Sequence, residues 1–288
     1  MVRPGPQVYV QTRGTARAAD YAFLCGAPPH TWWRAYRDAT AFDHPTVLVV
    51  SDGGGWAAYL SGIPSARVDA VGTVVRYTLV LDGLCGDGPV AAQLPAAVAA
   101  WLDDVADGLA GPLGRRLSAA LDARLPPDDV QRWIGASPPV SPTADGSVLS
   151  EPGRRVLDAL ATLPPPAPRG GPPPGDWVAG VGSAPARAAF TARVTDLVAG
   201  TPGRALLLNL VGPDDAGTVL DPASPVVVLV EGAGPGPQPL VVEAKKAPAP
   251  APGSRTAVAA VAGTVLMPVL ATAVVVVALI VTLVLLVL

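Results

Sequence analysis

The first part of the chain alternates between apolar and polar positions in a way that predicts β-strands. Val8 to Thr12 and Thr73 to Leu81 alternate, so one side of each strand is expected to face a core. Thr46 to Val50 is continuously apolar, as in a central strand buried on both faces. Tyr21 to Leu24 and Trp56 to Leu60 are shorter apolar runs. Because the connections are short, the pattern favours antiparallel hairpins.

Apolar residues then recur at helical spacing. Pro95 suits the first turn of a helix. The apolar stripe of this helix leaves three acidic residues largely on the solvent side, Asp103, Asp104 and Asp107. A stripe from Leu113 to Leu125 predicts a second helix, Asp128 to Ile134 a short third and Val156 to Leu163 a fourth.

A smaller α/β pattern follows a Pro/Gly-rich connector. Trp177 to Val181, Leu206 to Val211 and Val226 to Val230 predict strands. Between the first two, Ser183 suits the N-cap of a helix and Gly200 its end. Three strands and one helix make a thin independent core, so we expect them to complete the first region's sheet, with two separate domains as the alternative.

The patterns together predict an α+β protein with a mixed, largely antiparallel sheet and packed helices. Residues 1–134 form the strand-rich and then helical region, and 135–175 the connector with one amphipathic helix. Residues 176–231 form the small α/β unit, 232–256 a Pro/Ala-rich stalk, and 257–288 a transmembrane tail.

The tail is the strongest signal in the sequence. Residues 257–288 contain no charged residue and no Asn, Gln or His. At about 1.5 Å per residue, the Val- and Leu-rich part after Pro268 matches a hydrocarbon core of about 30 Å. We therefore predict a single-pass C-terminal anchor. The spacing of Ala259 and Gly263 leaves a homodimer through this helix as an open alternative.

The charges beside the tail predict its orientation. Lys245, Lys246 and Arg255 precede it, and no other lysine occurs in the chain. Positive flanks stay on the cytoplasmic side, so we expect a cytoplasmic body at the inner (plasma) membrane. Met1 to Gly14 has no apolar stretch, so no secretory signal is expected.

The composition of the chain argues against several classes of function. A net charge of −3 argues against nucleic-acid binding. Cys25 and Cys85 form no CxxC pair, and His30 and His44 do not complete a metal-ligand pattern, so we expect no metal or cofactor. Abundant Ala, Val, Gly, Pro and Arg with little Lys favour a GC-rich bacterial genome as the source.

Two segments could bind a ligand. Asp52, Gly53, Gly54 and Gly55 follow a buried strand, where backbone amides could cradle a phosphate, but no Lys-Ser/Thr follows, and a hairpin turn is the simpler interpretation. Residues 61–69 are predicted to form a loop that brings together Ser65, Arg67 and Asp69. An Arg67–Asp69 surface ion pair is the simpler interpretation there.

One segment could bind a protein partner. It packs aromatics among arginines: Trp32, Trp33, Arg34, Tyr36 and Arg37. Such clusters form binding hot spots, although a tryptophan anchored in the core would give the same pattern. On a helix, Trp32 and Tyr36 would share a face.

No catalytic motif such as GxSxG occurs, so the sequence favours a non-enzymatic protein. We expect a membrane-tethered adaptor that recruits a cytoplasmic protein partner. The alternative is a tethered ligand-sensing or enzymatic domain, for a nucleotide or another small molecule, in a bacterial signalling or defence system. A membrane-perturbing effector with the tail as its active part is a third hypothesis.

Overall fold

The computed structural model describes residues 7–14, 20–41, 43–86, 88–108, 116–134, 136, 149–166, 175–218, 220, 224–232 and 236–240. All of them belong to one compact unit, Met1–Lys245. The predicted transmembrane tail, most of the predicted stalk and its flanking Lys245, Lys246 and Arg255 lie outside the described residues. Within the described part, no helix is both long and apolar enough to cross a membrane.

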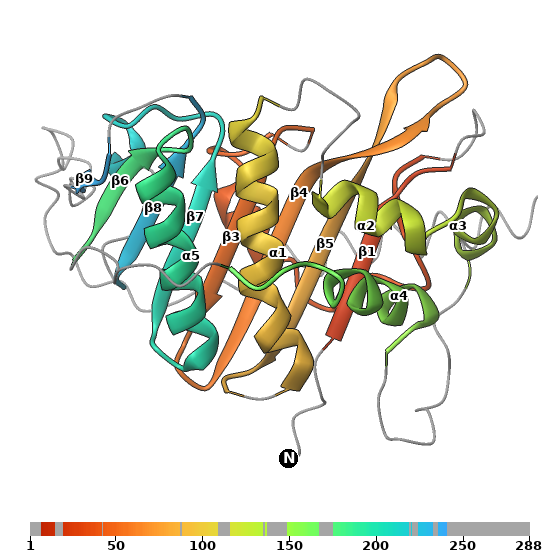
Figure 1. The fold of residues 1–288 in the computed structure, drawn as a ribbon, viewed down its shortest axis with the longest axis horizontal. Helices are drawn as coiled ribbons and strands as arrows, with labels where there is room; N and C mark the ends of the chain where they lie inside the picture. Colours follow the sequence, from red (N-terminus) through yellow and green to blue (C-terminus); the bar gives the residue numbers. More distant parts are fainter. Residues whose placement is uncertain are drawn as a thin grey trace, which may run out of the picture. The chain divides into compact units, whose positions relative to one another are not determined.

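One sheet of nine strands forms the centre of the described structure, in the order β2-β1-β5-β4-β3-β7-β8-β6-β9 (Figure 1). The strands are β1 (Gln7–Thr12), β2 (Ala22–Phe23), β3 (Thr46–Ser51), β4 (Gly55–Val68), β5 (Val74–Leu84), β6 (Trp177–Gly180), β7 (Gly203–Leu208), β8 (Val226–Val230) and β9 (Gln238–Pro239). Neighbouring strands are antiparallel, except that β8 runs parallel to both β7 and β6. The predicted mixed α+β fold is confirmed.

Strands from distant parts of the sequence share this sheet. β7 pairs with β3, so that Leu207 lies opposite Val47 and Ala205 opposite Val49. The middle of each strand, Val47 to Val49 and Ala205 to Leu207, is apolar and buried, as expected for central strands. The strands of residues 203–230 therefore extend the same sheet as the strands of the first region.

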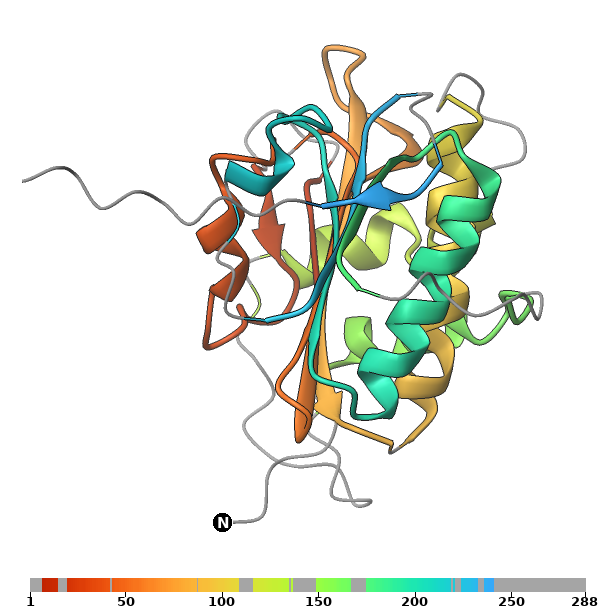
Figure 2. The same ribbon diagram turned by 90° about the vertical axis from the view of Figure 1, so that its left-hand side faces the viewer.

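All five α-helices described lie on one face of the sheet (Figure 2). They are α1 (Gly88–Ala106), α2 (Arg116–Arg124), α3 (Pro127–Trp133), α4 (Glu151–Leu160) and α5 (Ala184–Ala199). The alternation predicted for the fifth strand is confirmed, because Tyr77, Leu79 and Leu81 belong to the core on this face and Val80 to the core on the other. α5 begins and ends as predicted: the Ser183 hydroxyl accepts from the Ala186 amide, and Gly200 has a left-handed φ of 114°.

The other face of the sheet has a smaller core. Two short 3₁₀ helices lie on this side, η1 (Trp32–Tyr36) and η2 (Ala216–Thr218) (Figure 2). Its buried residues include Leu48, Tyr59 and Val80, with partly buried aromatic residues packed against them.

Three local predictions were wrong. α1 starts at Gly88, so Pro95 lies inside the helix and not in its first turn; the buried Val90 and Leu94 hold the extra turns against the core. Asp104 is only 5% exposed, and the hydrogen bond that its carboxylate accepts from the Arg116 amide offsets part of the cost of burying it. Residues 61–68 are not a loop but the second half of β4, paired with β5.

Candidate functional site

The two predicted ligand-binding segments lie at opposite ends of β4. Asp52 to Gly55 forms the turn that enters this strand, and Asp69 directly follows its last residue, Val68. At about 3.3 Å per residue, the strand separates them by roughly 40 Å. The structure therefore does not bring these two segments into one site.

The Asp52 to Gly55 segment is a closed hairpin turn. The Asp52 carboxylate accepts from the amides of Gly54 and Gly55, at 2.9 and 2.7 Å. The Ser51 hydroxyl accepts from the Gly53 amide at 3.2 Å, and Gly53 has a φ of 89°. Because these amides already have acceptors, they do not form the free anion-binding concavity that a phosphate requires.

Ser65 and Arg67 belong to a polar network on the helix-covered face, beside α2. The Ser65 hydroxyl donates to Asp122 Oδ1 at 2.6 Å, and the Ala66 amide donates to Asp122 Oδ2 at 2.7 Å. The Tyr77 hydroxyl also donates to Asp122 Oδ1, at 2.9 Å. Asp122, which the sequence analysis missed, is therefore the centre of this network.

Arg67 links the network to β1. Its Nε donates to the Ser65 hydroxyl at 3.0 Å and its Nη2 to the Thr12 hydroxyl at 3.0 Å. The guanidinium carbon lies 5.0 Å from the centre of the Tyr77 ring, within the range of a cation–π contact.

Asp69 pairs with a different arginine from the one expected. Its carboxylate lies 3.0 Å from Arg13 Nη1 and accepts from the amides of Val71 and Thr73. The Thr73 amide, followed by the other amides and Arg13, lowers the pKa of Asp69. Asp69 thus forms its ion pair with Arg13.

The polar side chains of this network are held by hydrogen bonds to one another. Burial raises the pKa of the Tyr77 phenol, so the hydroxyl stays protonated and donates to Asp122. The Ser65 hydroxyl donates to the Asp122 carboxylate and accepts from the amide and Nε of Arg67. The arrangement ties β4 and β5 to α2.

The predicted partner-binding residues form a half-exposed aromatic cluster at η1. Trp33 stacks on Tyr59 of β4 with ring centres 5.2 Å apart. Trp32 meets Trp33 and Tyr36 edge-on, at 6.2 and 6.5 Å. The predicted proximity of Trp32 and Tyr36 is thus observed, on a 3₁₀ helix. No residue of η1 is fully buried.

Arginines border this cluster. Arg34 and Arg37 are exposed, and the Arg37 side chain makes an exposed contact of 3.5 Å with Asp38. We call Trp32, Trp33, Arg34, Tyr36 and Arg37 the η1 surface. It combines aromatic rings that contact one another with exposed cationic groups, which is a combination suited to contacting another protein.

Asn209, to which the sequence analysis gave no role, anchors the segment that follows η1. Its side chain accepts from the Ala41 amide at 2.7 Å and donates to the Pro45 carbonyl at 3.0 Å and to the Thr46 hydroxyl at 2.8 Å. The Ala39 carbonyl in turn accepts from the Asn209 amide. An asparagine just after a strand is a weak signal for such a role, because Asn is common in turns generally.

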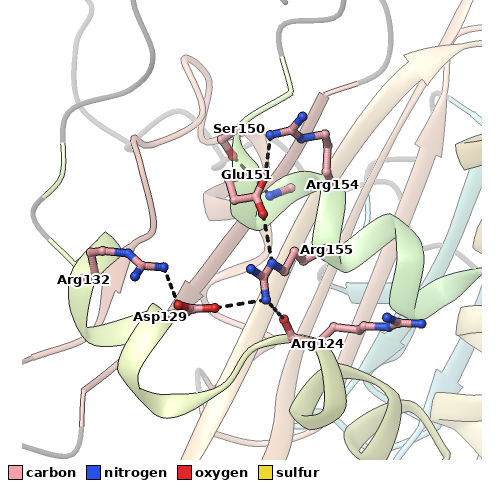
Figure 3. A network of polar contacts seen from close by, with 8 residues as sticks. Arg124, Asp129, Arg132, Ser150, Glu151, Arg154 and Arg155 are labelled. Atoms are coloured by element: carbon pink, nitrogen blue, oxygen red, sulfur yellow. Dashed lines mark hydrogen bonds and ion pairs between the residues drawn. The ribbon is translucent and has the colours of Figure 1, made fainter.

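A second polar network joins α3 and α4 (Figure 3). Arg155 donates to Glu151 at 3.0 Å and lies 3.0 Å from an oxygen of Asp129. Arg132 also pairs with Asp129, and Arg154 with Glu151. The hydrogen bond from Arg155 is the main reason that the pKa of Glu151 is lowered. The carboxylates of Asp129 and Glu151 are each paired with arginines, so we interpret this network as a structural link between α3 and α4.

The cysteines and histidines do not converge on a reactive centre in the part of the chain that the structure describes. Cys25 and Cys85 are unpaired and half-buried, and burial, with Glu151 nearby, raises the pKa of the Cys25 thiol. His44 lies 3.8 Å from Glu231 at the surface. Within these residues, no group of three His, Cys, Asp or Glu side chains is arranged to hold a metal ion.

Comparison with known proteins gives no family for this chain. No protein-family model matches it, and no curated protein or solved structure matches it significantly.

Proposed function

We propose that this chain is a tail-anchored membrane protein whose cytoplasmic body acts as an adaptor and binds a protein partner through the η1 surface. The observation that carries the proposal is the half-exposed aromatic cluster of Trp32, Trp33 and Tyr36, bordered by exposed Arg34 and Arg37. Trp, Tyr and Arg are the residues that dominate the binding energy of protein interfaces.

The composition of the η1 surface indicates the chemistry of its partner. The rings would be covered by apolar or aromatic side chains, and the guanidinium groups of Arg34 and Arg37 would meet carboxylates. The contact between Arg37 and Asp38 is exposed and contributes little, so a partner's carboxylate would displace Asp38 easily.

The membrane part of the proposal rests on the sequence. Residues 257–288 are uncharged and Lys245, Lys246 and Arg255 precede them. Together these features favour a single span with the body in the cytoplasm, at the inner membrane.

The alternative of a nucleotide-sensing or enzymatic pocket has less support. Its two predicted halves lie at opposite ends of β4, and the glycine-rich turn has its amides occupied by Ser51 and Asp52.

The test is partner capture with the full-length chain, expressed with an epitope tag and crosslinked before extraction. Arg34→Glu with Arg37→Glu should abolish crosslinking to the partner, because both changes reverse charge without touching the core. Arg124→Glu, a charge reversal at an exposed arginine of α2, is the matched control and should leave crosslinking unchanged. An identical set of crosslinked proteins from both variants would exclude the η1 surface as the interface.

A further inference from the structure

The β4–β5 hairpin extends well beyond the rest of the sheet as an arm. Ser61 is the last β4 residue that pairs with β3, whereas β4 continues to Val68 and pairs there only with β5. Figure 1 shows this segment in orange, projecting past the ends of the neighbouring strands. At about 3.3 Å per residue, the arm is roughly 20 Å long.

The end of the arm is apolar and exposed. We call Val68 to Val74 the arm tip. Val68, Val71 and Val74 are 51%, 66% and 40% exposed. Leu210 is the other large hydrophobic residue that is similarly exposed in the part of the chain that the structure describes. Exposed apolar residues gathered at one projecting point indicate contact with something apolar.

The arm tip exposes no charge. Its single ionisable residue is Asp69, whose side chain is only 5% exposed. The carboxylate faces inward, where it meets Arg13 and the amides of Val71 and Thr73. The arm tip itself therefore exposes no ionised side chain, although two arginines lie beside it: Arg13, which pairs with Asp69, and Arg67, which precedes Val68.

The polar backbone of the arm tip is also largely satisfied from within. The Asp69 amide donates to the Thr73 carbonyl at 2.9 Å, and the Gly72 amide donates to the Asp69 carbonyl at 3.0 Å. The amides of Val71 and Thr73 donate to the Asp69 carboxylate. A segment that leaves water must satisfy these donors internally, because unpaired amides are costly in an apolar medium.

The base of the arm is fixed to the body, so the arm tip is carried on a stiff support. Asp122 of α2 receives hydrogen bonds from Ser65, Ala66 and Tyr77. Ser118, one turn earlier on α2, donates to the Pro64 carbonyl. Two side chains of one helix thus bind the outer edge of β4 where β3 no longer covers it.

We propose that the arm tip inserts its valines into the interface of the lipid bilayer that holds the chain. This proposal rests on the membrane tether proposed above. A tether raises the effective concentration of the arm at the bilayer, so a weak apolar contact is enough to hold it there. The length of residues 232–256, at about 3.1 Å per residue when extended, lets the body reach the surface. An uncharged tip with satisfied amides suits a lipid interface, whereas no charge pattern on it selects a protein.

The experiment places an environment-sensitive fluorophore at the arm tip through Val71→Cys in the full-length chain. Leu210→Cys is the matched control, because Leu210 is the comparably exposed apolar residue outside the arm. The native Cys25 and Cys85 are half-buried, and the unmodified chain treated with the same dye gives their background. The vesicles contain phosphatidylcholine, a minor fraction of phosphatidylglycerol and, in a second set, lipids with a quencher in the acyl chain.

A C-terminal histidine tag and nickel-chelating lipid hold the body at the vesicle even if the tail does not insert. Failure of the anchor is then seen separately, as loss of the protein from nickel-free vesicles at alkaline pH. We expect the dye at Val71→Cys to shift to shorter wavelength and to be quenched by the acyl-chain quencher, whereas the dye at Leu210→Cys keeps its emission in water. Unshifted, unquenched emission at Val71→Cys on tethered protein would overturn the proposal. A shift to shorter wavelength that occurs only when a protein fraction is added would also overturn the proposal, because the arm tip would then bind a protein and not lipid.

Discussion

At the scale of single residues, Asp122 has the most consequential contacts. Its two oxygens accept from Ser65, Ala66 and Tyr77. In Asp122→Asn one oxygen becomes an NH₂ group, so at least one of these donors loses its acceptor. The expected loss of stability is about 1–3 kcal/mol, measured by urea unfolding. Asp158→Asn, at an exposed position of α4, should change it little. Equal stability of the two variants would mean that the Asp122 contacts are dispensable.

Whereas the contacts of Asp122 stabilise the fold, the ionised carboxylate of Asp82 is expected to destabilise it. Burial raises its pKa above the ordinary value of 3.8, although the Gln7 amide and His30 oppose the shift. The folded protein therefore binds the proton more tightly than the unfolded chain, and stability falls as the pH rises through this pKa. Asp82→Asn should raise the melting temperature at pH 7, and the gain should disappear below about pH 3.8, where the carboxyl is neutral in both states. A gain that is independent of pH would contradict the ionisation argument.

The sequence predicted some of these residues and missed others for a physical reason. Ser65, Arg67 and Asp69 attract attention because they are close in sequence. Their partners are Asp122, in α2, and Arg13, directly after β1, both more than fifty residues away. Hydrogen bonds between such distant residues depend on the packing of whole elements, which no local pattern records.

At the scale of elements, the strands and helices were largely predictable because each has one buried face. The alternation at Val75 to Leu81 and the cap at Ser183 were enough to place β5 and the start of α5. The sequence predicts a loop in the second half of β4, where Ser61, Gly62 and Pro64 interrupt the apolar pattern. The strand persists there because β5 supplies the pairing and α2 covers the other edge.

The close contact between α4 and β1 predicts that replacing a helical glycine by alanine destabilises the protein, although alanine has the higher helix propensity. Gly153 lies in α4, where alanine would favour the helix by about 1 kcal/mol. However, a Cβ at this position would lie 2.7 Å from the Val8 carbonyl oxygen of β1. Gly153→Ala should therefore destabilise the protein, by about 1–3 kcal/mol net, as overpacking forces α4 away from the sheet.

Gly212→Ala is the matched control for this change, because a Cβ there meets nothing within 4 Å. Its melting temperature should stay close to that of the unmodified chain. If Gly153→Ala instead melts higher than both, then α4 can shift freely on β1 and the close approach is not a constraint.

At the scale of the whole molecule, the proposed adaptor role depends on residues 257–288 acting as the anchor. The full chain should stay in the membrane pellet after alkaline extraction, because about 20 apolar residues are enough to hold a helix in the bilayer. Deletion of 257–288 should release the chain to the supernatant with the melting behaviour of its body unchanged, since every described element lies within Met1–Lys245.

An unrelated Leu/Ala-rich segment of the same length, put in place of the tail, should restore the pellet fraction. That control separates anchoring by hydrophobicity from a specific role of the native residues. If the deleted chain stays in the pellet, the body itself binds the membrane and the tail is not the anchor.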